Sequence, residues 1–171
     1  IITSTDKPYY IVYRDNIGIA GAYEKALSYN PKCIVELHFN SYKNSQASGT
    51  EVLVCNTKGE NFLYEYEIGK RLSSAVANAL GTRDRRVKER SKKGERGFYN
   101  ISQAAGPDAP PSLLLESFFG SSVDDSLKAR KNIKVMDFSI FDVFWLFLIL
   151  SALQPWWQRR QTEAKRIQTI Q

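Results

Sequence analysis

The chain is poor in the residue types that build metal centres and disulfide scaffolds. Its 171 residues include one histidine, two cysteines and one methionine. Cys33 and Cys55 form no Cys-x-x-Cys pair and are too few for a disulfide framework, so both are expected to lie in buried strands. His38 alone cannot complete a catalytic metal site, because such sites normally take three protein ligands.

The sequence also lacks a secretory leader at its start. Neither a basic region nor an apolar one follows Ile1, and the chain does not begin with methionine. We therefore expect Ile1 to be a cut and not a natural beginning. The only methionine is Met136.

Positive charge is confined to two patches. Arg83–Arg96 holds eight Lys or Arg against three Asp or Glu, and Trp156–Gln171 holds four against one, within a formal net charge of +6. Nucleic-acid-binding domains usually carry a continuous basic stripe. We therefore expect no nucleic-acid partner.

Short apolar segments typical of strands alternate along the chain with segments whose apolar residues have helical spacing. This order predicts an α/β fold with a mixed, mostly parallel sheet. The segment Thr82–Gly97 has no apolar periodicity and is predicted to be a solvent-facing loop. Gly81 stands where a helix C-cap is expected. Strands are predicted over Tyr9–Tyr13, Cys33–Phe39, Thr50–Cys55 and Ser112–Phe119, and helices over Ile19–Leu27, Asn61–Leu80 and Val123–Val135.

The composition changes after Met136, which predicts two parts, 1–135 and 136–171. Phe138–Leu153 is almost wholly apolar, and Trp156, Trp157 and a basic tail follow it. This order is typical of a membrane boundary and predicts an apolar membrane-associating helix. Because the stretch is shorter than the ~20 residues of a usual span, an interfacial helix and a buried core helix stay open as alternatives.

Two polar residues stand near the ends of apolar strands. His38 shares one predicted strand face with Glu36 and Asn40, and Glu116 follows three leucines directly. A lone histidine is more often structural than a ligand, whereas a carboxylate entering a buried strand must be paired, protonated or functional. A histidine and a glutamate at strand ends are compatible with metal-assisted hydrolysis.

Four motifs, in this order, resemble the zinc-dependent N-acetylmuramoyl-L-alanine amidases. The resemblance covers roughly Tyr9 to Val135 and implies a three-layer α/β sandwich that is incomplete at its N-terminus. The motifs are VELHFNSY at Val35–Tyr42, SGTEVLV at Ser48–Val54, RGFYNI at Arg96–Ile101 and PSLLLESFFGSSVDD at Pro111–Asp125.

The resemblance implies that His38 is a zinc ligand and that Glu116 is the catalytic carboxylate. The implied reaction cleaves the amide between N-acetylmuramic acid and L-alanine in peptidoglycan. Glu36 is a candidate to orient the His38 imidazole. Arg96 and Asn40 are predicted to contact substrate, since the basic segment borders the groove in the family and stem peptides carry carboxylates.

The family's other two zinc ligands, a histidine and a glutamate, precede the position of Tyr9, and neither has a counterpart in this chain. We therefore expect weak or absent zinc binding, no hydrolysis by the chain as given, a monomer, and a location in the cell envelope or outside the cell. The alternative is a non-catalytic, membrane-tethered module that binds the cell wall or another partner.

The segment from Met136 resembles the beginning of the serine dehydrogenase proteinase family, which opens with an apolar segment, a turn and a basic helix. Nothing of that family's catalytic region is present. The junction at Met136 is consistent with a fused reading frame.

Overall fold

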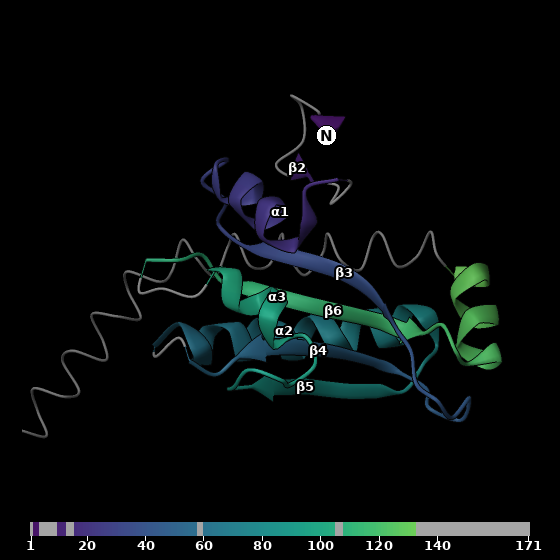
Figure 1. Ribbon diagram of the computed structural model, residues 1–171. Helices are drawn as coiled ribbons and strands as arrows, with labels where there is room; N and C mark the ends of the chain where they lie inside the picture. The colour runs from purple at the N-terminus through teal and green to yellow at the C-terminus, as the bar shows by residue number, and fades with distance from the viewer. Residues whose placement is uncertain (1, 4–9, 13–15, 58–59, 105–107, 133–171) are drawn as a thin grey trace, which may run out of the picture.

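The computed structural model describes residues 2–3, 10–12, 16–57, 60–104 and 108–132 (Figure 1). A four-stranded sheet lies at its centre, in the order β3-β6-β4-β5. The four strands are β3 (Ile34–Asn40), β4 (Thr50–Cys55), β5 (Asp84–Arg90) and β6 (Ser112–Phe119). β3 pairs parallel with β6, and β4 pairs parallel with β5, while β4 and β6 run antiparallel. The predicted α/β class with a mixed sheet is confirmed.

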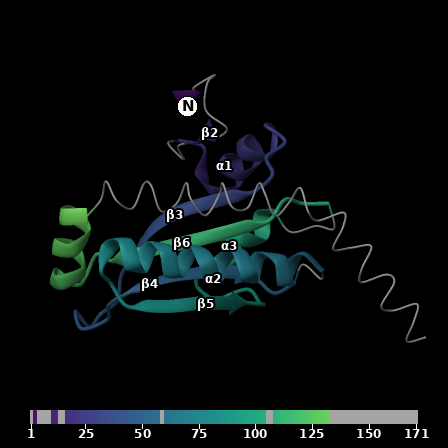
Figure 2. The same ribbon diagram turned by 180° about the vertical axis from the view of Figure 1, so that it is seen from behind.

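The long helix α2 (Glu60–Leu80) covers one face of the sheet (Figure 2). Its buried side chains Ile68, Leu72 and Val76 pack against alternate residues of β4 and β6. The helix ends at Gly81, which has a φ of 70° and therefore the left-handed conformation of a C-cap. Both the predicted helix and its predicted cap are confirmed.

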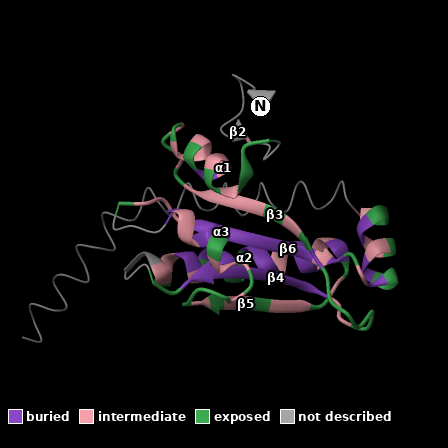
Figure 3. Ribbon diagram, in the orientation of Figure 1, coloured by how far each residue is buried: buried purple, intermediate pink, exposed green. Residues whose placement is uncertain are grey.

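The opposite face carries smaller elements, namely α1 (Gly18–Leu27), the short helix α3 (Phe98–Ile101) and the 3-10 turn η1 (Ser102–Ala104). Leu53 and Leu114, the neighbours of the residues that face α2, pack there against Ile101. Figure 3 shows the result as a buried centre, β4 and β6, between the less buried strands β3 and β5.

The prediction of a loop over Thr82–Gly97 is wrong, because β5 occupies most of it. In this edge strand Val87 packs against the core, whereas five of the seven residues are Arg, Lys or Glu. Long charged side chains can lie along a sheet edge with their ends in water, so an edge strand need not show apolar alternation.

The remaining predicted elements are present within the described residues. The strand expected over Tyr9–Tyr13 appears as β2 (Tyr10–Ile11), which pairs antiparallel with β1 (Ile2–Thr3). The helix expected over Val123–Val135 spans residues 123–132 as far as it is described. Cys55 is buried, Cys33 is half-buried, and neither forms a disulfide. The apolar helix predicted within Phe138–Leu153 lies outside the described residues.

Candidate functional site

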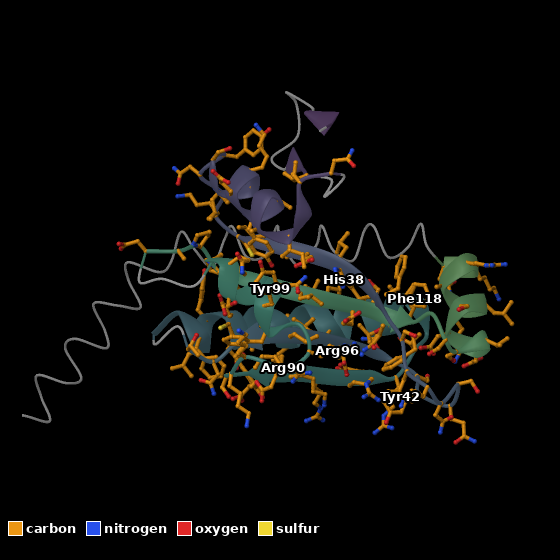
Figure 4. All side chains as sticks on the ribbon, viewed as in Figure 1. His38, Tyr42, Arg90, Arg96, Tyr99 and Phe118 are labelled. Carbon is orange, nitrogen blue, oxygen red and sulfur yellow. The ribbon has the colours of Figure 1, made fainter. Side chains whose placement is uncertain are left out.

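His38 and Glu116 lie next to each other on neighbouring strands. They are partners in the parallel register of β3 and β6, so their side chains leave the same face of the sheet. That face is the one that α3 covers, because Leu114, two residues before Glu116, packs against Ile101. Figure 4 shows His38 on this side together with Arg96.

Glu116 is buried, with only 4% of its surface exposed. One carboxylate oxygen, Oε1, accepts a hydrogen bond of 2.9 Å from Arg96 Nη2. The other, Oε2, is buried and has no hydrogen-bond partner among the described residues. A buried polar atom without a partner is rare in proteins and marks a position where a water or ligand group is expected to bind.

Arg96 connects both strands of the site. Its guanidinium donates to Glu116, to the Oδ1 atom of Asn40 and, at 3.2 Å, to the backbone carbonyl of Ser41. Half of the side-chain surface stays exposed. Arg96 is therefore a positive group that is fixed on one side and open to solvent on the other.

Hydrogen bonds within the loop after β5 hold the backbone of Arg96 in position beside the site. The backbone N–H groups of Ser91 and Lys92 donate to the Glu95 carboxylate, and these bonds lower the Glu95 pKa below its ordinary value. Arg90 Nε donates to the Arg96 carbonyl at 2.8 Å. Gly97 has a φ of 79°, and an added Cβ would lie 2.6 Å from Leu53 Cδ2, so any other residue here would strain the backbone and displace Leu53.

Glu36 contacts the His38 imidazole, and its role in orienting the ring stays a prediction from sequence. Glu36 Oε1 lies 2.9 Å from His38 Nε2 and accepts a bond of 2.8 Å from Asn100, while Oε2 accepts one of 3.0 Å from the Tyr23 hydroxyl. Burial raises the pKa of Glu36, but the bonds from His38, Asn100 and Tyr23 outweigh it and lower the pKa below its usual value. Glu36 therefore carries a negative charge beside the ring.

Asn40 is buried, and both ends of its side-chain amide are used inside the protein. Nδ2 donates 2.9 Å to Glu51 Oε1, and Oδ1 accepts from Arg96. Glu51 in turn accepts a bond of 2.7 Å from Arg85 Nε. This network places Asn40 behind Arg96, where it positions the guanidinium. A direct substrate contact by Asn40 stays a prediction from sequence.

Sequence reasoning missed four residues of this site. Glu51 and Asn100 lie inside the quoted motifs SGTEVLV and RGFYNI, so the motifs did signal them, although no role had been assigned. Tyr23 and Arg85 carry no such signal, because only the folded chain brings them to Glu36 and Glu51. Glu24 on α1 is exposed and takes no part in the site.

The residues at this site do not fit a complete zinc centre. Among the described residues, no group of three or more His, Cys, Asp or Glu side chains could hold a metal ion. His38 already contacts Glu36 through Nε2, and Glu116 is bound to Arg96. The part of the chain that the structure describes therefore brings no three ligand side chains together at this site.

A cavity of about 470 Å³ lies elsewhere, between the end of α1 and the segment that leads into β6. Leu27, Lys32, Gln103, Asp108 and Pro110 contribute to its lining. None of the predicted site residues reaches it. The chemistry of His38 and Glu116 is thus separate from this cavity.

The fold and the paired strand residues define an amidase-type α/β domain, and comparisons with known proteins identify its family. The N-acetylmuramoyl-L-alanine amidase family model matches residues 1–138. The chain therefore belongs to the N-acetylmuramoyl-L-alanine amidase family. No curated protein matches it significantly.

Solved amidase structures share the fold at low sequence identity. The N-acetylmuramoyl-L-alanine amidase from Clostridium difficile 630 is 21% identical with a TM-score of 0.56, over 71% of this chain and 60% of that one. The amidase AmiC2 of Nostoc punctiforme is 18% identical with a TM-score of 0.58, over 82% and 67%. The CwlD amidase from Clostridioides difficile, solved with the GerS lipoprotein, is 18% identical with a TM-score of 0.56, over 82% and 72%. This chain thus spans less than two thirds of the first of these.

Proposed function

We propose that the chain belongs to the peptidoglycan-hydrolysing machinery of the cell envelope. Its site is built for cleavage of the amide between N-acetylmuramic acid and L-alanine, and Glu116 is the group that accepts a proton from the attacking water. The observation that carries the proposal is the buried carboxylate itself. Arg96 holds its Oε1, while its Oε2 lacks a partner among the described residues.

The geometry supports a division of work between the residues. Arg96 fixes the orientation of Glu116, so that Oε2 can act as a general base without rotating. The exposed side of the guanidinium is available to the carboxylates of a stem peptide, which arginine binds well. Glu36 holds the His38 ring in one orientation through a contact of 2.9 Å. These roles for Glu116, Arg96, His38 and Glu36 are proposals.

Because the zinc ligands in this chain are incomplete, we expect the chain alone to bind little zinc and to lack hydrolytic activity. With one histidine in the sequence and no three-ligand group in the described residues, we expect substoichiometric zinc and no release of stem peptides by the 171-residue chain. A chain that binds the wall without cleaving it is the second candidate function. The same mismatch in the ligand set favours it.

The experiment compares the chain with a version extended at its N-terminus by the His- and Glu-bearing amidase segment that the resemblance places before Tyr9. We expect the extension to restore bound zinc and release of stem peptides from purified sacculi. In the extended protein, Glu116→Gln is expected to keep zinc and lose on the order of 10²–10⁴-fold in rate. His38→Ala is expected to lose the metal.

Two results would contradict the proposal. Stoichiometric zinc in the monomeric 171-residue chain, measured by elemental analysis after dialysis, means that the ligand set has been misjudged. Full activity of the Glu116→Gln variant means that Glu116 is not the base. Binding of the chain to sacculi with no activity in any version supports the wall-binding alternative.

Membrane association through Phe138–Leu153 stays a prediction from sequence, because the segment lies outside the described residues. Of the helices that the structure describes, none combines the length and apolar character that crossing a membrane needs. Flotation of the full chain with lipid vesicles tests the association.

A further inference from the structure

Arg96 has donor groups that its contacts within the protein do not use. Its Nη2 atom donates to Glu116 and to Asn40, and Nη1 donates to the carbonyl of Ser41 at 3.2 Å. A guanidinium carries five N–H groups. The Nε–H group and one N–H group of Nη1 therefore have no partner among the described residues, and half of the side chain is exposed. Arg96 can bind a further acceptor without releasing Glu116.

The charges around Arg96 favour an anionic group as this acceptor. The segment Arg90–Arg96 contains four Lys or Arg residues against one Glu, a net charge of +3. Arg90 donates through Nε and Nη1 to the carbonyls of Arg96 and Glu89, which carry no net charge and leave its positive charge in place. Figure 4 shows Arg90 and Arg96 on the β5 side of the site. Glu116 alone does not balance this segment, so a second carboxylate is attracted to it.

Two other carboxylates of the site do not take this place. Glu51 accepts a bond of 2.7 Å from Arg85, which balances its charge. Glu36 precedes Asn40, the residue of β3 that Arg96 contacts, by four positions, and four residues span about 13 Å of a strand. In the part of the chain that the structure describes, the proposed base is thus the one ion-pair partner of Arg96.

The distance from Glu116 indicates which carboxylate of a stem peptide can reach Arg96. Oε2 of Glu116 would contact the attacking water, and Oε1 lies 2.9 Å from Arg96 Nη2. Two hydrogen bonds and the width of one carboxylate place the guanidinium within about 8 Å of that water. Two residues of extended peptide span about 7 Å, whereas three span about 10 Å. In an extended stem peptide, the carboxylate on the residue after L-alanine fits this distance.

From these observations, and resting on the proposed function, we propose that Arg96 binds the residue after L-alanine and selects stem peptides in which its α-carboxylate is free. In peptidoglycan this residue is a D-glutamate linked through its side-chain carboxyl, and its α-carboxyl group is either free or converted to a carboxamide. The carboxylate accepts a charge-assisted hydrogen bond from Arg96, whereas the carboxamide offers a neutral oxygen. The chain therefore recognises walls whose stems are not amidated at this position.

Two muramoyl tripeptides that differ in one group test the proposal on the 171-residue chain. Both are N-acetylmuramoyl-L-alanyl-D-glutamyl-L-lysine, and the α-carboxyl of the glutamate is free in one and a carboxamide in the other. In isothermal titration calorimetry we expect the free acid to bind about tenfold more tightly, because the bond to a half-exposed arginine loses its charge in the carboxamide. Equal affinities, a preference for the carboxamide, or no binding of either peptide to the folded chain overturn the proposal.

Variants test whether the preference belongs to Arg96. Arg96→Gln is expected to bind both tripeptides equally, whereas Arg96→Lys keeps the charge and part of the preference. Lys93→Gln is the matched control, because it removes one exposed positive charge from the same segment and is expected to leave the ratio of affinities unchanged. If Arg96→Gln weakens both tripeptides at an unchanged ratio, Arg96 only supports the structure of the site, which contradicts the proposal.

Failure of this inference can be distinguished from failure of the proposed function. If Glu116→Gln in the extended protein stays fully active, the base has been misassigned, whatever the affinities of the two tripeptides. If that variant loses activity as expected and the tripeptides bind equally to the parent chain, the proposed function stands and only the role of Arg96 in specificity is wrong.

Discussion

The two faces of the central sheet differ sharply, although the same strands supply both. Toward α2, the strands present Val52, Val54, Leu113 and Leu115, which form the main core. Toward α3, the apolar cluster is smaller, and the strands also carry the hydrogen-bonded carboxylates Glu36, Glu51 and Glu116. Alternation along a strand thus separates the residues that stabilise the fold from those that carry chemistry.

The largest difference between the two faces is expected at two adjacent residues of β6. Leu115→Ala removes a fully buried side chain from the α2 face and is expected to cost about 2–5 kcal/mol of unfolding free energy. Glu116→Gln, one residue along on the other face, is expected to change stability by less than about 1.5 kcal/mol, because its partner Arg96 is half exposed and water can solvate the guanidinium that loses the carboxylate. Urea denaturation followed by circular dichroism measures both. Similar losses in the two variants contradict the division between faces.

A smaller effect is expected where the loop meets the α3 face. Gly97→Ala combines a left-handed φ with a Cβ that would lie 2.6 Å from Leu53, so we expect a loss of about 2–4 kcal/mol. Gly94→Ala is the matched control, since its φ is also positive but no atom lies within 4 Å of its added Cβ. It is expected to show only the conformational cost of about 1–2 kcal/mol. Equal losses in the two variants mean that close packing at Gly97 is unimportant.

The smallest effect concerns the phenol that supports Glu36. Tyr23→Phe removes a hydrogen bond to a carboxylate and is expected to cost about 1–2 kcal/mol at pH 7. Burial, followed by the charge of Glu36, raises the Tyr23 pKa far above its ordinary value of about 10. The folded state therefore holds this proton more tightly than the unfolded state, and the contribution to stability is complete below pH 10 and lost as pH rises above it.

The same variant provides the test of this pH dependence. Denaturation between pH 8 and pH 11 is expected to show a weaker alkaline loss of stability in Tyr23→Phe than in the parent chain. Tyr42→Phe is the control for removing a phenol from the surface, because 62% of Tyr42 is exposed. Parallel slopes in the parent and Tyr23→Phe proteins assign the alkaline loss to other groups.

The elements that bury apolar residues in a regular pattern could be predicted from the sequence. Strands β3, β4 and β6 and the helix α2 were predicted because their alternation or helical spacing reflects the core directly. β5 was missed, because none of its residues is fully buried and Val87 is its only apolar residue, so the strand carries no such pattern. The sequence predicted that His38 and Glu116 lie near strand ends, whereas the register that pairs them was seen only in the structure.

The connections around these two residues could not be predicted. Arg96 reaches Glu116 across 20 positions of sequence, and Asn100 reaches Glu36 across 64. Such contacts depend on how the loop after β5 folds back over the sheet. No local pattern of residues predicts the course of this loop. The positive φ of Gly97 marks the point where the loop turns toward α3.

The position of β6 in the sheet has a consequence for how the chain folds. β3 and β4 are consecutive strands in the sequence, but β6, the last strand among the described residues, lies between them. No hairpin can therefore form first and grow outward, and the central pairs join residues 78 positions apart, as at His38 and Glu116. Contacts of such long sequence separation slow folding, so a nascent chain that has not yet released Ser112–Phe119 holds two unpaired strand edges. We expect refolding to be limited by insertion of β6, and the fragment made before it to require protection from aggregation during synthesis.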